Sequence, residues 1–144
     1  IVGTHNYVRF NDPFTKKEVY GMIMEFIRGR SLAHHLAERK TESKPLTPEE
    51  IRRILLQVCE ALEYAHTQNP PVLHRDLTPF NVMVAENGSI KLMDFGIARV
   101  LDDTLESTTT ASGMRFGTPA YMPPELFSAG APVDARVDVY LPIR

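Results

Sequence analysis

Two polar segments flank a short hairpin pattern in the middle of the chain, and together they constrain the fold more than any other feature. Residues 82–84 and 90–93 are apolar runs separated by Glu86-Asn87-Gly88, and Asn-Gly is typical of a tight turn between antiparallel strands. The polar segment 74–81 leads into the first run, and residues 94–96 follow the second. Because a hairpin brings its two ends together, we expect side chains of both polar segments at one end of the ribbon.

Residues 48–66 form the strongest helical pattern of the chain. Residues 47–50 supply an N-cap threonine, a first-turn proline and a glutamate three residues after the cap, which is a capping-box start. Cys59 borders the apolar face, and we expect it to be a small core residue. The residues that recur at the spacing of one helix face are Ile51, Ile54, Leu55, Val58, Leu62 and Ala65.

The rest of the chain yields shorter elements. Residues 6–10 and 19–27 are apolar and aromatic with a polar turn between them, and they predict two strands. Residues 32–39 predict a short helix. Residues 102–118 are rich in threonine and serine and indicate a long polar loop. Residues 134–141 predict the start of another helix, which the following proline would end.

Length, charge and cysteine content narrow the class of protein. The 144 residues suit about one domain, and the net charge of −2 offers no bulk positive field for nucleic acid or an anionic membrane. A single cysteine excludes a disulfide within the chain and fits a reducing compartment. No apolar run approaches the roughly 18 residues that a membrane span needs. We therefore expect a cytoplasmic domain without a membrane span in these residues.

Three oxygen-bearing side chains are the candidates for chemistry. Asn81 enters the first strand of the hairpin, Asp94 leaves the second, and Asp76 lies on the loop just before. Carboxylate and amide oxygens of this kind suit Mg²⁺, usually together with the phosphates of a substrate. The sequence thus predicts a magnesium and phosphate site at this end of the hairpin.

At this point the chain resembles a protein kinase. His74-Arg75-Asp76-Leu77-Thr78-Pro79-Phe80-Asn81 is similar to the catalytic loop of that family, and Asp94-Phe95-Gly96 to its metal-binding triplet. Residues 117–125 are similar to the segment that ends in Pro-Glu. The amino-acid sequence of residues 91–99 most resembles that of the eukaryotic-like serine/threonine kinases of bacteria.

The resemblance implies an α+β fold and a partial kinase domain. Residues 1–27 would be the last two strands of the N-lobe and the hinge, so the N-lobe would be incomplete. Residues 28–144 would be a partial, mainly helical C-lobe that runs through the activation segment. Two strands taken from a five-stranded sheet are not stable alone, so we expect a marginal, aggregation-prone chain.

The resemblance also implies an activity, in which the γ-phosphoryl group of ATP passes to a serine or threonine of a protein substrate. Asp76 would orient the substrate hydroxyl, and Asn81 and Asp94 would hold Mg²⁺. Thr118 would bond near Asp76 and favour a serine or threonine acceptor. The cofactors implied are ATP and Mg²⁺.

Further positions follow from the same resemblance. His74 and Phe95 would stack in an internal hydrophobic spine. Arg75 would pair with a phosphate on the activation loop, for which the candidates are Thr108, Thr109 and Thr110. Around the adenine, Met24 would line the back of the pocket, Met83 would form its floor, and the backbones of Glu25 and Ile27 would meet the ring.

Three departures from the family pattern matter. Nothing in the chain resembles the glycine-rich loop, the strand lysine or the helix glutamate that position the phosphates. Thr78 stands where serine/threonine kinases usually have a lysine. Asp138 matches the aspartate that braces the catalytic loop from the next long helix, but Pro142 would halt that helix early. We therefore expect the chain to be weakly active by itself.

Two alternatives remain. The first is a pseudokinase-like module without catalysis that binds or regulates partners, which the missing phosphate clamp and Thr78 favour. The second is a small-molecule phosphotransferase of related fold, against which residues 117–125 argue. A dimer, or a partner that activates the chain, is compatible with either kinase reading, and the full-length protein could be anchored in a membrane.

Overall fold

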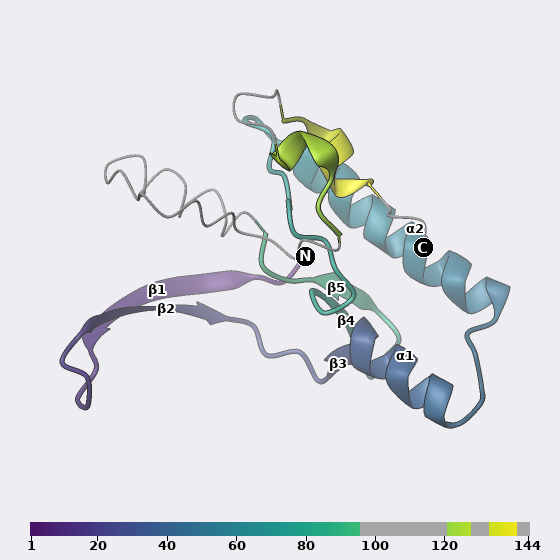
Figure 1. Cartoon of the computed structure of the whole chain (residues 1–144), viewed down its shortest axis with the longest axis horizontal. Coiled ribbons are helices and arrows are strands. Elements are labelled where there is room, and N and C mark those ends of the chain that lie inside the picture. Colours follow the sequence, from purple (N-terminus) through teal and green to yellow (C-terminus); the bar gives the residue numbers. More distant parts are fainter. Residues whose placement is uncertain (96–120, 128–132, 141–144) are drawn as a thin grey trace.

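The structure is a computed structural model, and it describes residues 1–95, 121–127 and 133–140. Strands and helices mix in the way that the α+β class predicts, which confirms the expected fold class (Figure 1). In chain order the elements are β1 (Thr4–Asn11), β2 (Glu18–Met24), β3 (Gly29–Ser31), α1 (Leu32–Thr41), α2 (Pro48–His66), β4 (Val82–Ala85), β5 (Ile90–Leu92) and the 3₁₀ helices η2 (Pro124–Phe127) and η3 (Ala135–Asp138).

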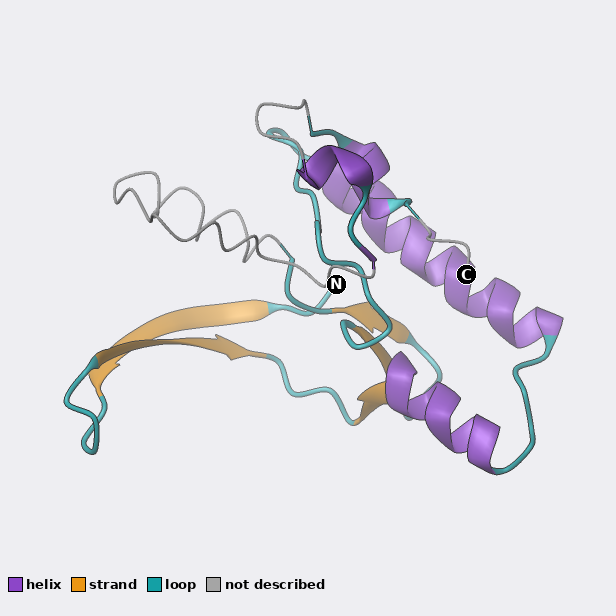
Figure 2. Cartoon of the chain, viewed as in Figure 1, coloured by secondary structure: helices purple, strands orange, loops and turns teal. Residues whose placement is uncertain are grey.

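The strands form two separate antiparallel sheets. Strands β1 and β2 make a two-stranded ribbon, in which Tyr7 lies opposite Met22. Strands β3, β4 and β5 make a three-stranded sheet in that order, in which Val82 lies opposite Leu92. Figure 2 shows the β1–β2 ribbon projecting away from the helices, while the other sheet lies between α1 and α2. The expected hairpin around Asn87-Gly88 is the β4–β5 pair.

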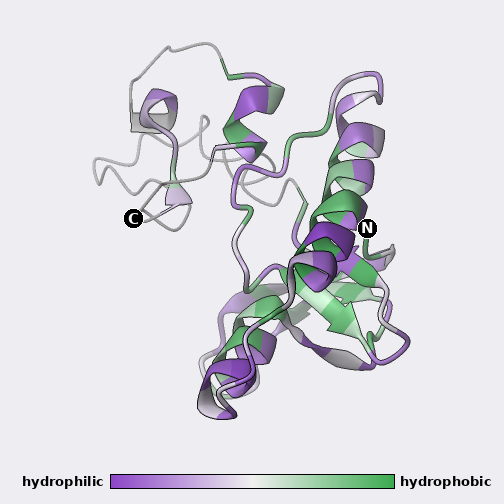
Figure 3. Ribbon diagram, turned by 90° about the vertical axis from the view of Figure 1, so that its right-hand side faces the viewer, coloured by the Kyte–Doolittle hydropathy of each residue, from purple (hydrophilic) through white to green (hydrophobic). Residues whose placement is uncertain are grey.

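The core lies between α2 and the three-stranded sheet. Its members are buried apolar side chains that face each other across this layer, and Figure 3 shows hydrophobic residues along α2 and on the strands beside it. Gln57 adds a polar link, because its Oε1 accepts a hydrogen bond of 3.0 Å from the amide of Ile90. The buried cluster consists of Ile54, Val58, Leu62, Val82, Ile90 and Leu92.

Local capping explains where the helices begin. The hydroxyl of Thr47 accepts from the amide of Glu50, whose carboxylate accepts from the amide of Thr47, so the predicted capping box is confirmed and α2 spans 48–66 as expected. Glu50 also pairs with Arg39 of α1 at 2.6 Å, which joins the two helices. Helix α1 begins after Ser31, whose hydroxyl accepts from the amide of His34.

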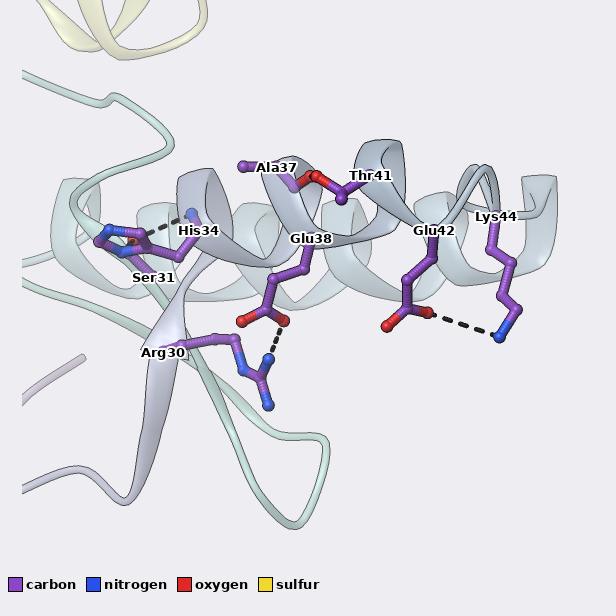
Figure 4. A network of polar contacts seen from close by, with 8 residues as sticks. All are labelled: Arg30, Ser31, His34, Ala37, Glu38, Thr41, Glu42 and Lys44. Atoms are coloured by element: carbon purple, nitrogen blue, oxygen red, sulfur yellow. Dashed lines mark hydrogen bonds and ion pairs between the residues drawn. The ribbon is translucent and has the colours of Figure 1, made fainter.

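The outer surface of α1 carries a row of polar contacts (Figure 4). Arg30 pairs with Glu38, and Lys44 pairs with Glu42 at 3.5 Å. These side chains are about half exposed or more, and ion pairs of that kind contribute little to stability. They give α1 a polar, solvent-facing outer surface, and the opposite side of the helix faces the sheet.

Several sequence expectations were wrong in detail. Strand β2 ends at Met24 rather than at residue 27, because the last backbone bond beside it joins Glu25 to Gly3 and the amide of Val2 bonds to Leu92 of β5 instead. Strand β3 was not expected. It pairs antiparallel with β4, and Gly29 approaches β4 so closely that a Cβ there would overlap the carbonyl oxygen of Val84. Residues 135–138 form only the 3₁₀ helix η3.

The buried face of α2 is narrower than its apolar pattern. Ile51 and Leu55 are 43% and 52% exposed, and Cys59 is exposed rather than a core residue. The sheet beneath α2 has only three short strands, so it covers one line of the helix, which consists of Ile54, Val58, Leu62 and Ala65. The expectation that all six apolar residues share one buried face was therefore wrong for two of them.

Candidate functional site

The hairpin places the two polar segments next to each other. Val82 and Leu92 are paired at the end of β4–β5, and one residue beyond, the amide of Met93 donates to the carbonyl oxygen of Asn81 at 2.9 Å. Asp94 follows immediately. Asn81 and Asp94 therefore lie at the same end of the hairpin, on neighbouring lengths of backbone.

Asn81 also contacts Asp76 directly. Its Nδ2 donates to the backbone carbonyl of Asp76 at 2.8 Å and to the Asp76 carboxylate at 3.1 Å. Both partners are acceptors, so the amide must present its NH₂ group on this side, and its Oδ1 points the other way. Both side chains are half-buried. The contact keeps the Asp76 carboxylate next to the Asn81 side chain and leaves the Asn81 amide oxygen free of this bond.

Asp94 faces a small cavity under the ribbon. The cavity has a volume of about 50 Å³, and its lining includes Asp94, Phe95, Met22 and Met24. Asp94 adopts a left-handed backbone conformation with φ 60°, which a non-glycine residue takes at a cost of roughly 1–2 kcal/mol. Such conformations cluster at functional sites, where they direct a side chain to a particular place.

The donor set suits a magnesium ion held mainly by its ligand's phosphates. Among the residues that the structure describes, no three His, Cys, Asp or Glu side chains lie together as a metal site. The available protein donors are the Asn81 amide oxygen and the Asp94 carboxylate. Mg²⁺ commonly takes one or two such protein oxygens and fills its other positions with water and phosphate.

His74 lies buried beneath this site. Its side chain is 1% exposed, and its ring centroid is 4.6 Å from that of Phe95, with the two rings tilted by 52°. Neither ring nitrogen has a hydrogen-bond partner within the described part of the chain. Burial lowers the pKa of His74, against the opposing charges of Asp138 and Asp76, so the ring packs as a neutral group.

Residues 74–81 are anchored at both ends. Asp138 of η3 accepts from the amide of His74 at 2.7 Å and from the amide of Arg75 at 2.6 Å. Arg75 has a left-handed backbone with φ 64°, which these bonds hold in place. At the other end, the amide of Ala33 at the start of α1 donates to the carbonyl of Pro79 at 2.9 Å. The loop is thereby fixed to two different parts of the fold.

The residues that the resemblance assigns to the adenine site do not line one common cavity. Met24 lines the small cavity with Asp94, whereas Ile27 lines a larger, separate cavity of about 370 Å³ that Lys91 and Glu86 also border. Met83 is half-buried on β4, opposite Ser31 and Lys91. The structure thus brings Met24 to Asp94, and it does not bring Ile27 or Met83 to the same cavity.

Glu25 forms a link that sequence reasoning missed. Its carboxylate accepts from the amide of Gly3 at 2.8 Å and from Nζ of Lys91 at 3.0 Å. The Gly3 amide is the main reason why the pKa of Glu25 lies below its ordinary value, and Lys91 adds to it. No sequence signal points to this contact, because Glu25 and Lys91 are 66 positions apart.

The remaining predicted residues fall into two groups. Thr78 is buried, with 3% exposure, and its carbonyl accepts from the amide of Asn81 at 3.0 Å. Thr118 and Thr108–Thr110 lie outside the described residues. His66, which no sequence pattern singles out, contacts Asp138 through its Nε2 at 2.8 Å.

The sequence of the chain is similar to that of known proteins. The family model described as protein kinase domain matches residues 2–141. A probable serine/threonine-protein kinase PknB of Corynebacterium glutamicum is 41% identical over 119 residues, and serine/threonine-protein kinase PknB of Mycolicibacterium smegmatis is 37% identical over 122 residues. The aligned part is 83% of this chain but only 17% and 18% of those two relatives. The chain therefore spans about a sixth of the length of the curated relatives it matches.

Within the described residues, α2 and the other helices are too short or too polar to cross a membrane.

Proposed function

Because this chain belongs to the protein kinase family, we propose that it carries the catalytic centre of a bacterial-type serine/threonine protein kinase. The reaction is transfer of the γ-phosphoryl group of ATP to a serine or threonine hydroxyl of a protein substrate. Residues 1–27 supply the end of the N-lobe and the hinge, and residues 28–144 supply the C-lobe through the activation segment. The names of the relatives support the choice of serine and threonine as acceptors.

The contact between Asn81 and Asp76 carries this proposal. Asp76 orients the substrate hydroxyl and accepts its proton, and the 3.1 Å bond from Asn81 fixes its carboxylate. The same bond occupies the NH₂ group of Asn81 and leaves Oδ1 as the atom of this side chain that would hold a metal ion. Positioning of this kind is the main contribution of a protein to phosphoryl transfer.

The metal and the nucleotide would be held by neighbouring groups. Asn81 through Oδ1 and Asp94 through its carboxylate are the residues that would hold Mg²⁺, which when bound neutralises the charge of the transferring phosphates. Met24, which lines the cavity with Asp94, would stand behind the adenine. The Glu25 and Ile27 backbones and the Met83 side chain are proposed to contact adenine on the family resemblance alone, since Ile27 and Met83 do not line the cavity that holds Met24.

Two further assignments concern residues around the loop. Thr118 would bond near Asp76 and select a serine or threonine acceptor. Arg75, at the braced end of the loop, would bind a phosphate on Thr108, Thr109 or Thr110, so that phosphorylation orders the activation segment by charge pairing.

A nucleotide titration of the chain with and without Mg²⁺ tests the proposal. We expect a fluorescent ATP analogue to bind more tightly when Mg²⁺ is present, and Asp94→Asn to abolish that difference. Asp76→Asn should leave the Mg²⁺ dependence intact, because Asp76 is not a proposed metal ligand, yet should lower phosphoryl transfer to a protein substrate by about 10²–10⁴-fold.

The matched control is Glu60→Gln, which removes one exposed carboxylate from α2. It should change neither binding nor transfer. Equal affinity with and without Mg²⁺ in the unmodified chain would contradict the proposal and would support a binding module without catalysis.

A further inference from the structure

The carboxylate of Asp138 is fully buried, and three donors surround it. Its side chain is 0% exposed. One oxygen, Oδ1, accepts from the amide of Arg75, while Oδ2 accepts from both the amide of His74 and Nε2 of His66. A carboxylate in such a place is stable only when its oxygens are hydrogen-bonded, since burial otherwise removes its solvation.

Of the three donors, only His66 donates from a side chain, and contacts at the end of α2 hold that residue in place. It is the last residue of α2, and its side chain is 16% exposed. The hydroxyl of Thr67 bonds back to carbonyls of Glu63 and Tyr64, and the amide of Val72 bonds to Ala65, so the end of the helix is closed around it. The imidazole is therefore presented to Asp138 from a rigid element.

The chemistry of the contact fixes the state of the ring. An ionised carboxylate can only accept hydrogen bonds, so at 2.8 Å the Nε2 atom of His66 must carry a hydrogen. The bond to a charged acceptor is of the stronger, charge-assisted kind. It also shares Oδ2 with the amide of His74, so rotation of the carboxylate would break both bonds together.

We propose that His66 is a positioning residue, which holds the Asp138 carboxylate in the one orientation that can bind the His74 and Arg75 amides. Through Asp138 it fixes the left-handed turn at Arg75 and, one residue later, the backbone of Asp76. Its importance for phosphoryl transfer rests on the function proposed above, whereas its effect on the loop does not.

Local hydrogen exchange measured by NMR on the chain tests this inference. We expect His66→Leu, which removes the donor, to speed exchange of the His74 and Arg75 amides by about tenfold or more, as loss of a bond to a charged group would. Exchange of the Val58 amide in the middle of α2 should not change. His66→Gln, whose amide can donate from a similar position, should restore much of the protection.

Two further measurements complete the design. His5→Gln, a change on the exposed strand β1, should leave the exchange of both loop amides unchanged. In the unmodified chain, ring ¹⁵N shifts of His66 should show a protonated Nε2, and this measurement decides the matter if His66→Leu does not fold. An unprotonated Nε2, or equal acceleration at Val58 and at the two loop amides, would overturn the inference.

These readouts are independent of phosphoryl transfer. If exchange responds as expected and the chain transfers no phosphoryl group, the positioning role stands and the kinase activity fails. If transfer is observed and exchange at His74 and Arg75 is unchanged in His66→Leu, the positioning role fails alone.

Discussion

Removal of the Asp138 carboxylate is the most informative perturbation that the structure suggests. Asp138→Ala would leave the amides of His74 and Arg75 and the imidazole of His66 without their acceptor. All three donors converge on a carboxylate that is 0% exposed, so water does not replace it without opening the loop. The perturbation therefore acts on the start of the loop 74–81 and on the C-terminal end of α2 at the same time.

The size of the effect can be worked out from these contacts. Each buried amide left unpaired costs about 1–3 kcal/mol, so two of them cost about 2–6 kcal/mol. Relaxation of Arg75 from its left-handed conformation would return roughly 1–2 kcal/mol. Taking the middle of each range, a cost of about 4 kcal/mol and a return of about 1.5 kcal/mol, we expect a net loss of about 2.5 kcal/mol in the free energy of unfolding. A typical domain has only about 5–15 kcal/mol in total, so this loss is large.

Urea unfolding followed by far-ultraviolet circular dichroism measures that loss. The matched control is Asp134→Asn, four residues earlier, where the exposed side chain caps η3 and asparagine caps equally well. Arg136 pairs with Asp134 and holds the pKa of that carboxyl at about 2, but the pair is open to solvent, so the control should unfold close to the unmodified chain. A loss below about 1 kcal/mol for Asp138→Ala would refute the view that this carboxylate braces the loop.

Two further predictions concern stability. Burial lowers the pKa of His74 in the folded chain, so the unfolded state binds more protons as the pH falls through the ordinary histidine value of about 6.5. The free energy of unfolding should therefore be highest above that pH and decrease below it. Urea melts from pH 7.5 to 5 should show this slope, and His74→Phe should flatten it; an equal slope in the variant would assign the pH dependence to another group. Gly29→Ala should destabilise the chain by about 1–3 kcal/mol, because the added Cβ overlaps the Val84 carbonyl oxygen; Gly3→Ala, whose Cβ would make an ordinary contact of 3.7 Å, is the control, and equal urea midpoints for both would show that β3 is not held so closely.

Local signals were sufficient for the elements that define the middle of the chain. The capping box at Thr47 and Glu50 located the start of α2, because both partners of that contact lie within one turn. Asn87-Gly88 located the hairpin, because the turn between two antiparallel strands depends on the conformations of a few adjacent residues. The position of Asn81 beside the strand end that leads to Asp94 followed from the hairpin alone.

Contacts between distant segments could not be found in this way. Strand β3 is three residues long, and its partner β4 begins more than fifty positions later, so nothing local distinguishes it from a loop. The bond from His66 to Asp138 spans 72 positions and depends on how the chain returns to the end of α2. The exposure of Cys59 likewise depends on the width of the neighbouring sheet rather than on the helix.

The N-terminal residues join the two sheets in a way that has mechanical consequences. The amide of Val2 bonds to Leu92 at 2.8 Å, and Glu25, just past β2, pairs with Lys91 at 3.0 Å. Both attachment points lie within three residues of Asp94. The β1–β2 ribbon is thus attached to the rest of the fold beside Asp94, and any swing of the ribbon would pull on β5, which ends two residues before that side chain.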